Sequence, residues 1–310
     1  MSKRSSLLLV ALLCGLLAPA CRVSDPTAEQ VIPWNYVADR VPTQVDVAYG
    51  PGAVHRLDVY PAQGTPSGVA LVFLHSGGWS SGDKDAARVH LIPQWLMDRG
   101  HVVFSANYTL TANGTSAFPT NVDDVKRAIA WANNPARKAQ YGYQKVIVVG
   151  TSAGGHLALL ATTSGHAVPD GLTAAAIRPD AAMSFSGPLN MLTWGAQGTQ
   201  EQRDVQLAFF QGFWGNSVAS PDQVPELARV AASPHAFVDA NDPSVFVSSS
   251  DTDPLALAAH NANVLEQAYT DVGANARAWN DIVEGDGHNL AFTNIAAAQL
   301  FITKVAAGEL

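Results

Sequence analysis

Short, largely apolar runs alternate with amphipathic segments along most of this chain. Apolar runs of five or six residues are typical of strands that are buried on both faces of a parallel sheet. Such runs predict strands at residues 69–74, 101–106, 145–149, 181–185, 243–247 and 278–283. Apolar residues at helical spacing predict helices at residues 86–99, 121–132, 255–272 and 295–306. This alternation predicts an α/β fold with a mostly parallel central sheet, flanked by helices.

Two segments depart from this rhythm. Residues 45–49 and 56–60 alternate apolar and polar positions around Gly50-Pro51-Gly52, which predicts an antiparallel hairpin. Residues 187–233 have no clear period, and we expect them to form a small, irregular, cap-like insertion over the functional site. The aromatic side chains of this insertion either line an apolar pocket or pack against the sheet. These side chains are Trp194, Phe209, Phe210, Phe213 and Trp214.

The N-terminal region has the features of an export signal. Lys3-Arg4 is followed by an apolar run to Leu17 and by Ala18-Pro19-Ala20-Cys21, which predicts a signal peptide at residues 1–20. The run is too short for a membrane-spanning helix. Export to a bacterial periplasm, outer surface or medium follows from this interpretation. The polar, proline-punctuated residues 21–43 are then expected to form an N-terminal tether.

Cys21 has two interpretations that the sequence leaves open. It is either the acylated first residue of a lipoprotein, and therefore a lipid anchor, or the residue that follows an A-x-A cleavage site. Ala18-Pro19-Ala20-Cys21 resembles a lipobox, although such boxes usually carry Leu where this chain has Ala18. The other cysteine, Cys14, lies inside the signal, so the mature chain is expected to form no internal disulfide.

Composition narrows the class of protein and of partner. The 310 residues are 47% hydrophobic and 14% charged, as in an ordinary globular protein, and fit one α/β domain at residues 44–310. The formal net charge of −8 becomes more negative when the signal is removed, which argues against nucleic acid and anionic membrane surfaces as partners. The chain has neither an H-E-x-x-H motif nor a cysteine cluster, so we expect no metal and no cofactor. The oligomeric state is not predicted.

The most informative motif is Gly150-Thr151-Ser152-Ala153-Gly154. It follows a predicted strand and precedes a predicted helix, which is the context of a nucleophile elbow. A serine on so sharp a turn needs small neighbours, and Gly150 and Gly154 provide them. The N-terminus of the next helix favours negative charge beside the serine. We therefore expect Ser152 to be a nucleophile.

A serine nucleophile needs a base and a third group that orients the base. The chain order in this arrangement is Ser, acid, His. His288 lies in the glycine-rich segment Glu284–Asn289, between the last predicted strand and the last helix, and is our candidate base. His156, His166, His235 and His260 also lie downstream of Ser152, but His156, within the elbow helix, cannot easily turn back, and we expect His235 and His260 to be structural or exposed. Asp253 is the preferred acid, with Asp251 as the runner-up.

Hydrolysis through a tetrahedral oxyanion also requires N–H donors near the serine. One candidate is the N–H of Ala153, the residue after the nucleophile. The segment His75-Ser76-Gly77-Gly78-Trp79 directly follows a buried strand, and its glycines allow backbone amides to turn toward a substrate. The amides of Gly77, Gly78 and Ala153 are therefore our candidate oxyanion hole.

Taken together, these motifs resemble the esterase and lipase branch of the α/β-hydrolase fold. This branch includes hormone-sensitive-lipase-like esterases, feruloyl and acetyl esterases, and kynurenine formamidases. The resemblance runs from about Val45 to the C-terminus and is weakest at residues 187–233. The residues that carry it are His75–Trp79, Gly82-Asp83-Lys84, Asn107-Tyr108, Phe118-Pro119, Val122–Val125, Trp131 and Gly150–His156.

The resemblance implies roles for individual residues. Ser152 matches the nucleophile, Asp253 the acid and His288 the base, and His75 matches a loop histidine that shapes the oxyanion hole. Two positions depart from the pattern of the branch. Ser76 replaces the usual first glycine of the oxyanion loop, and Ser249-Ser250 stands where relatives often have His-Gly.

We therefore expect an exported serine hydrolase that cleaves small-molecule carboxylic esters through an acyl-enzyme, with short-chain or aryl esters favoured. One alternative is an amidase, such as an arylformamidase of the kynurenine formamidase type, although export argues against it. A peptidase is a weaker alternative, because the chain has no large accessory domain. A non-catalytic binding protein on the same fold is the alternative from another class, and it predicts that a fluorophosphonate does not label Ser152.

Overall fold

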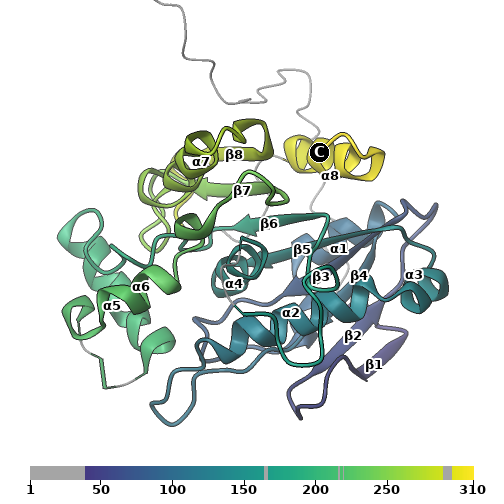
Figure 1. The fold of residues 1–310 in the computed structure, drawn as a ribbon, viewed down its shortest axis with the longest axis horizontal. Helices are drawn as coiled ribbons and strands as arrows, with labels where there is room; N and C mark the ends of the chain where they lie inside the picture. The colour runs from purple at the N-terminus through teal and green to yellow at the C-terminus, as the bar shows by residue number, and fades with distance from the viewer. Residues whose placement is uncertain (1–38, 164–166, 216, 219, 289–294) are drawn as a thin grey trace, which may run out of the picture.

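The computed structural model describes residues 39–163, 167–215, 217–218, 220–288 and 295–310 (Figure 1). The predicted signal peptide, Cys21, most of the predicted tether and His166 lie outside the described residues. No helix in the described part of the chain is long and apolar enough to cross a membrane.

An eight-stranded sheet forms the centre of the molecule, with the order β1-β2-β4-β3-β5-β6-β7-β8. β2 is antiparallel to β1 and β4, and every other pair of neighbours is parallel. The predicted α/β fold with a mostly parallel sheet is thereby confirmed, and so is the hairpin at its edge. The strands are β1 (Gln44–Ala48), β2 (Arg56–Tyr60), β3 (Val69–Leu74), β4 (Val102–Ala106), β5 (Lys145–Thr151), β6 (Ala181–Phe185), β7 (Ser244–Ser250) and β8 (Ala278–Val283).

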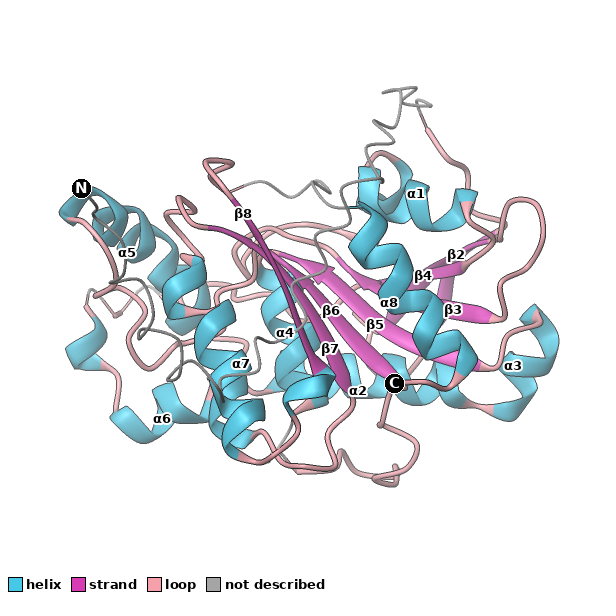
Figure 2. Ribbon diagram, turned by 90° about the horizontal axis from the view of Figure 1, so that it is seen from above, coloured by secondary structure: helices cyan, strands magenta, loops and turns pink. Residues whose placement is uncertain are grey.

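Helices cover both faces of this sheet (Figure 2). Alternate residues of β3 show why: Ala70, Val72 and Leu74 join the core under α2, α4 and α7, whereas Leu71 and Phe73 join the core under α1 and α8. The helices are α1 (Leu91–Asp98), α2 (Thr120–Asn133), α3 (Pro135–Tyr141), α4 (Ala153–Thr162), α5 (Gln200–Trp214), α6 (Glu226–Ala231), α7 (Ala262–Asp271) and α8 (Ile295–Ala307).

The prediction of an irregular backbone at residues 187–233 is wrong in part. α5 and α6 lie in this segment, together at one end of the molecule (Figure 1). α5 begins at a capping box in which Thr199 and Gln202 each bind the other's backbone N–H. Helical structure here was therefore encoded locally, even though the apolar positions gave no clear period.

Two predicted helices are also shorter than expected. Residues 86–99 divide into a 3-10 turn, η1 (Lys84–Arg88), and α1, because the His90 imidazole accepts the backbone N–H of Ile92 and starts a new helix there. Residues 255–272 divide into η4 (Ala258–His260) and α7. The backbone N–H groups of Leu255 and Ala256 donate to the Asp253 carboxylate, which holds this stretch outside the helix.

Candidate active site

Ser152 occupies a strained turn between β5 and α4. Its backbone lies at φ 51° and ψ −119°, in a region that side-chain-bearing residues rarely adopt, and its N–H donates to Phe185 O at 2.8 Å. A Cβ atom on Gly150 would lie 2.3 Å from the Gly154 carbonyl oxygen, and one on Gly154 would lie 2.2 Å from Leu74 O. Glycine at these two positions therefore lets α4 start directly against β5 and β3, with Ser152 at the end of the strand.

Ser152, His288 and Asp253 form a hydrogen-bonded array across three loops. The Ser152 Oγ lies 3.1 Å from His288 Nε2, and His288 Nδ1 lies 2.9 Å from both carboxylate oxygens of Asp253. A carboxylate only accepts, so Nδ1 carries the imidazole proton and Nε2 is left to accept from the serine hydroxyl. The Asp253 carboxylate is fully buried, whereas the His288 side chain is 21% exposed. The array is therefore open on the side of the histidine and the serine.

The two candidate acids occupy different environments. Asp253 faces His288, and its Oδ1 also accepts the N–H groups of Leu255 at 2.8 Å and Ala256 at 3.0 Å. Asp251 is exposed, and its Oδ1 accepts the N–H of Gly285 at 2.8 Å. Asp253 is thus placed to orient the imidazole, and Asp251 to shape the loop that carries it.

Further hydrogen bonds join the turn after β7 to residues 284–288, which carry His288 and which we call the histidine loop. The Ser250 Oγ accepts the Asp286 N–H, and the Thr252 Oγ1 accepts the Gly287 N–H, both at 3.1 Å. Sequence reasoning noted Ser249-Ser250 only as a departure from related chains, and did not predict this linkage. A hydroxyl at position 250 thus helps to fix the backbone just before His288.

The segment after β3 lies beside the elbow, because Leu74 is the register partner of Gly150 in the sheet. Its backbone takes positive φ at three successive residues: Gly77 at 123°, Gly78 at 58° and Trp79 at 60°. Ala153, the third candidate donor, is the first residue of α4. The structure thus places the segment of Gly77 and Gly78 and the N-terminal end of α4 at the same edge of the sheet as Ser152, where β3 and β5 end. We call residues 75–79, which carry two of the three candidate oxyanion donors, the oxyanion loop.

His75, the first residue of the oxyanion loop, holds the loop in place. Its imidazole stacks on the Tyr108 ring, with 4.4 Å between ring centroids, and its Nδ1 donates to Ser76 O at 2.7 Å. The Tyr108 hydroxyl donates to His75 O at 2.8 Å. Burial lowers the pKa of His75 below its ordinary value, so the imidazole is neutral near pH 7. These contacts make His75 a structural part of the loop.

Trp79 and His156 hold the far end of the oxyanion loop. The indole N–H of Trp79 donates to His156 Nδ1 at 3.2 Å, and His156 Nε2 donates to Ala232 O at 2.8 Å. Both side chains are buried, and Trp79 also packs edge-on against Trp194 and Phe213. From the sequence, we expected only that His156, within the elbow helix, could not turn back to act as the base. In the structure it links the oxyanion loop, the elbow helix and the end of the insertion.

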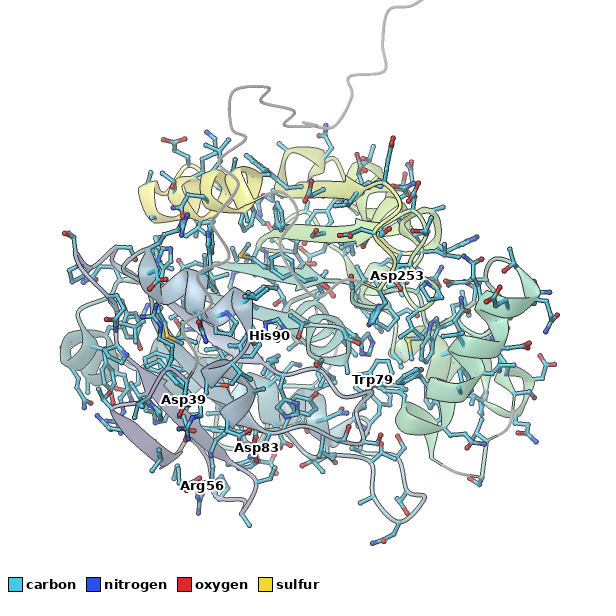
Figure 3. The ribbon with its side chains drawn as sticks, turned by 180° about the vertical axis from the view of Figure 1, so that it is seen from behind. Asp39, Arg56, Trp79, Asp83, His90 and Asp253 are labelled. Carbon is cyan, nitrogen blue, oxygen red and sulfur yellow. The ribbon has the colours of Figure 1, made fainter. Side chains whose placement is uncertain are left out.

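α5 packs directly on the oxyanion loop. A Cβ atom on Gly212 would lie 2.4 Å from Gly78 O, so the helix backbone touches the loop backbone. The same helix reaches the turn after β7, because the amide of the buried Gln206 donates to Pro254 O at 3.0 Å. In Figure 3, Asp253 and Trp79 both lie toward the end of the molecule that carries α5. Residues 200–214 therefore connect two parts of the candidate site.

His235 and His260 lie outside this array. Burial lowers the pKa of His235, whose Nδ1 lies 3.3 Å from Leu189 O, and His260 is exposed in η4. Among the residues that the structure describes, no group of three or more His, Cys, Asp or Glu side chains is placed to hold a metal ion.

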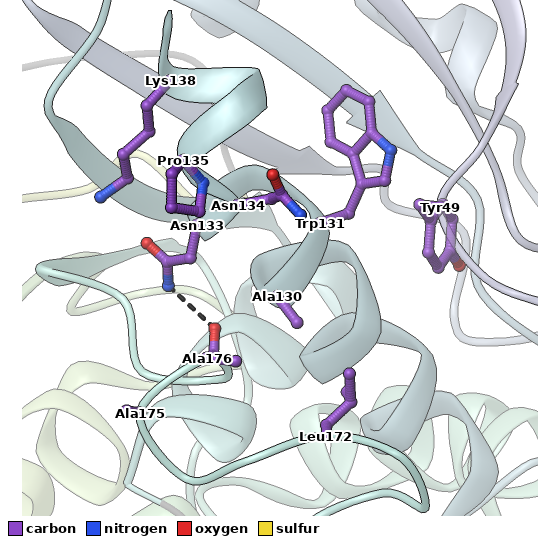
Figure 4. Close-up of a pocket in the computed structure, with 10 residues that line it drawn as sticks. All are labelled: Tyr49, Ala130, Trp131, Asn133, Asn134, Pro135, Lys138, Leu172, Ala175 and Ala176. Carbon is purple, nitrogen blue, oxygen red and sulfur yellow. Dashed lines mark hydrogen bonds between the residues drawn. The ribbon is translucent and has the colours of Figure 1, made fainter.

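A separate surface hollow of about 600 Å³ lies between α2, α3 and residues 172–176 (Figure 4). Trp131, Asn133 and Tyr49 are among its lining residues, and the Asn133 amide donates to Ala176 O at 3.0 Å. Ser152, Asp253 and His288 do not line this hollow, so it is distinct from the candidate active site.

Comparison with known proteins gives a family match. The BD-FAE family model matches residues 57–268. The esterase LipQ of Mycobacterium tuberculosis is 28% identical over 240 residues, which cover 74% of this chain and 53% of LipQ. A kynurenine formamidase of Danio rerio is 29% identical over 120 residues, which cover 38% of each protein. The chain therefore spans about half or less of the length of these curated relatives.

Solved structures show the same architecture. A truncated carbohydrate esterase from gut microbiota has a TM-score of 0.66 and 21% sequence identity, over 87% of this chain and 98% of that chain. At this level of identity the likeness establishes the fold.

Proposed function

The chain belongs to the BD-FAE family, an esterase family with the α/β-hydrolase fold, and on this premise we propose that it hydrolyses carboxylic esters. The observation that carries the proposal is the array of Ser152, His288 and Asp253, with separations of 3.1 and 2.9 Å, at the end of a nucleophile elbow. A nucleophile, a base and an orienting carboxylate in this geometry perform acyl transfer on many unrelated folds.

In the proposed reaction, the Ser152 Oγ attacks the ester carbonyl carbon while His288 Nε2 takes the hydroxyl proton. The carbonyl oxygen becomes an oxyanion that faces the N–H groups of Gly77, Gly78 and Ala153. Collapse of this intermediate breaks the ester C–O bond, and His288 returns its proton to the leaving alkoxide, so that the alcohol departs. A water molecule, deprotonated by His288, then attacks the acyl carbon. The bond from this carbon to Ser152 Oγ breaks, His288 returns the proton to Oγ, and the acid departs.

Asp253 has a double part in this reaction. It holds the imidazole in the tautomer that leaves Nε2 free to accept a proton, and it stabilises the imidazolium that forms. Its burial strengthens this interaction because little water screens the charge, and the two backbone N–H bonds to Oδ1 offset the desolvation of the carboxylate. The shape of the turn after β7 thus serves both the fold and the proposed chemistry.

An amidase of the kynurenine formamidase type is the second candidate. The 38% coverage of a kynurenine formamidase favours it, because such enzymes belong to the same branch. The substrate separates the two proposals: an arylformamidase cleaves the C–N bond of an N-formyl aniline faster than an ester of matched size. A binding protein without catalysis is the third candidate, and it requires no reaction at Ser152.

We also propose export, on the basis of Lys3-Arg4, the apolar run to Leu17 and the small residues before Cys21. In this proposal Cys21 becomes the first residue of the mature chain and carries the lipid anchor. Mass spectrometry of the mature N-terminal peptide tests it: an acylated cysteine supports the anchor, and a free or absent Cys21 contradicts it.

The experiment that tests the proposed function compares the wild type with Ser152→Ala on p-nitrophenyl esters of two to eight carbon atoms and on N-formylaniline. We expect kcat to fall by about 10⁴-fold or more in the variant, because removal of a triad serine leaves only binding and oxyanion stabilisation. The matched control is Ser80→Ala, an exposed serine just beyond the oxyanion loop, which is expected to keep near-wild-type activity.

Labelling with a fluorophosphonate, followed by peptide mass spectrometry, provides a second readout at Ser152. Ester turnover by the wild type no faster than by Ser152→Ala, together with unlabelled Ser152, would refute the proposal and favour the binding protein. Faster cleavage of N-formylaniline than of the esters would favour the amidase.

A further inference from the structure

Five aromatic residues of the insertion differ sharply in exposure. Trp194, Phe210 and Phe213 are buried, at 1%, 0% and 0% exposure, and Trp214 is partly buried against the same core. Phe209 is 41% exposed. Four of the five therefore pack into the core, and Phe209 alone of the five presents a largely open apolar face.

Phe209 lies against the oxyanion loop. A Cβ atom on Gly78 would lie 2.9 Å from Phe209 Cδ1 and 3.3 Å from its Cε1, so the ring edge meets the Gly78 backbone. A side chain at position 78 would collide with this ring, and the Gly78 backbone, at φ 58°, also disfavours one. The ring is thus held on one side by the loop, while its other side faces solvent.

Contacts one turn before and one turn after Phe209 fix the place of α5, and therefore of this ring, relative to two loops of the candidate site. One turn before it, the Gln206 amide donates to Pro254 O, next to Asp253, and accepts the Gly195 N–H at 2.8 Å. One turn after it, Gly212 touches the Gly78 carbonyl. The two anchors bind the oxyanion loop and the turn after β7 that carries Asp253, which we call the acid loop, so the ring of Phe209 lies between two segments of the candidate site.

From this arrangement we infer that Phe209 is the specificity-determining wall of the site, and that it selects esters carrying an aromatic group next to the scissile carboxyl. The inference rests on the proposed function, because it needs the ester oxygen at the N–H groups of Gly77, Gly78 and Ala153. With the oxygen there, the proposal places one substituent of the carbonyl carbon near Gly78, against the ring that packs on this residue. An exposed phenyl ring that packs on one side against the loop favours a second ring in an offset or edge-to-face pair, beyond the area that it buries.

The test measures kcat/KM of the wild type, Phe209→Ala and Phe209→Leu on two pairs of substrates. Phenyl acetate and ethyl acetate differ in the alcohol, and methyl benzoate and methyl butyrate differ in the acyl group. Dividing each variant value by the wild-type value for the same substrate removes the difference in intrinsic reactivity. We expect Phe209→Ala to lower kcat/KM about 5- to 10-fold for the aryl member of at least one pair, and less than 2-fold for the alkyl members.

Phe209→Leu keeps an apolar side chain without a ring, so we expect wild-type kcat/KM for the alkyl esters and only a partial recovery of kcat/KM for the aryl esters. The matched control is Leu227→Ala on α6, in the same insertion and 83% exposed, which should leave all four ratios near one. An equal fall for aryl and alkyl esters would overturn the inference, because it would indicate a loosened oxyanion loop rather than a lost contact. Unchanged ratios would overturn it as well.

Failure of this inference is separable from failure of the proposed function. If the wild type does not hydrolyse any of the four esters and Ser152 is not labelled by a fluorophosphonate, the esterase proposal itself fails. If the wild type hydrolyses them and the ratios do not depend on the ring at position 209, the esterase proposal stands and the specificity role of Phe209 is wrong.

Discussion

Replacement of Asp253 by asparagine gives the sharpest test of the candidate site, because the change is nearly isosteric. The asparagine oxygen can still accept the N–H groups of Leu255 and Ala256, which now donate to Oδ1 at 2.8 and 3.0 Å. The amide NH₂ then takes the place of Oδ2 and faces His288 Nδ1, which lies 2.9 Å away. Oδ1 lies equally close to Nδ1, but an NH₂ donor at the place of Oδ2 repels a proton on that nitrogen, so the tautomer with its proton on Nε2 is favoured instead.

An imidazole protonated on Nε2 no longer accepts the Ser152 proton. The charge that would stabilise the imidazolium is also lost from a fully buried position. Change of an aspartate to asparagine in a triad of this geometry costs about 10⁴-fold in kcat. We therefore expect Asp253→Asn to lose about 10³- to 10⁴-fold, which corresponds to roughly 4 to 5.5 kcal/mol of transition-state stabilisation.

Asp251→Asn is the matched control, because it makes the same chemical change two residues away. The exposed Asp251 accepts the Gly285 N–H, and an asparagine oxygen can keep this bond, so we expect less than a 5-fold loss. Ester hydrolysis of both variants is compared with their urea unfolding midpoints, which exclude loss of fold as the cause. Activity of Asp253→Asn within 10-fold of the wild type, or an equal loss in Asp251→Asn, would show that the orienting carboxylate has been assigned to the wrong residue.

Two further predictions concern positioning and pH. Trp79→Phe removes the N–H that donates to His156 Nδ1, so we expect a several-fold fall in kcat with little change in KM. In the double variant with His156→Leu, the fall in kcat should be smaller than the product of the two single falls, whereas a fully multiplicative fall would show that the two residues act independently. Burial lowers the pKa of His101 to about 4, below the ordinary value of about 6.5, so its contribution to stability is present above pH 6.5 and lost as the pH falls toward 4. The free energy of unfolding in urea, measured at pH 7.5 and pH 5, should decline less for His101→Gln than for the wild type, and an equal decline would contradict the assignment.

The sequence predicted the central strands of the sheet well because they are buried on both faces. Residues 69–74 and 181–185 have the same bounds in the sequence prediction and in the structure, since a buried, largely apolar run ends where polar backbone must leave the sheet. The helices were harder to predict wherever a side chain bonded the backbone. His90 starts a helix inside a predicted one, and Asp253 draws two amides away from another. Periodicity carries no signal for such contacts.

α5 escaped prediction for a related reason. Its inward face carries a buried glutamine, Gln206, between apolar residues, which interrupts the apolar period. That glutamine forms bonds to Gly195, Gln197 and Pro254, so its place in the core depends on partners outside the helix. The capping box of Thr199 and Gln202 was the local signal that could have marked the helix.

The candidate site likewise has parts that the sequence predicts and contacts that it does not. Ser152 was predictable because the elbow needs glycines at fixed positions on either side, and this requirement is written in five consecutive residues. The structure brings His288 and Asp253 to that serine, as the order of residues along the chain led us to expect, while their catalytic roles stay predictions. The bonds of Ser250 and Thr252 to the histidine loop join segments more than thirty residues apart, and no local pattern announces them.

These long-range contacts also change the role that the insertion is expected to have. The serine is positioned by its own turn, but the other parts of the site are held by segments that meet only in the folded chain. Gln206 holds the acid loop, Gly212 touches the oxyanion loop, and Ala232, at the end of the insertion, binds the histidine that holds Trp79. A lid that only covered a substrate would contact solvent and ligand rather than the backbone of both loops. The insertion is therefore part of the frame that holds both loops of the candidate site, and an exposed residue of it, such as Phe209, can be changed without breaking that frame.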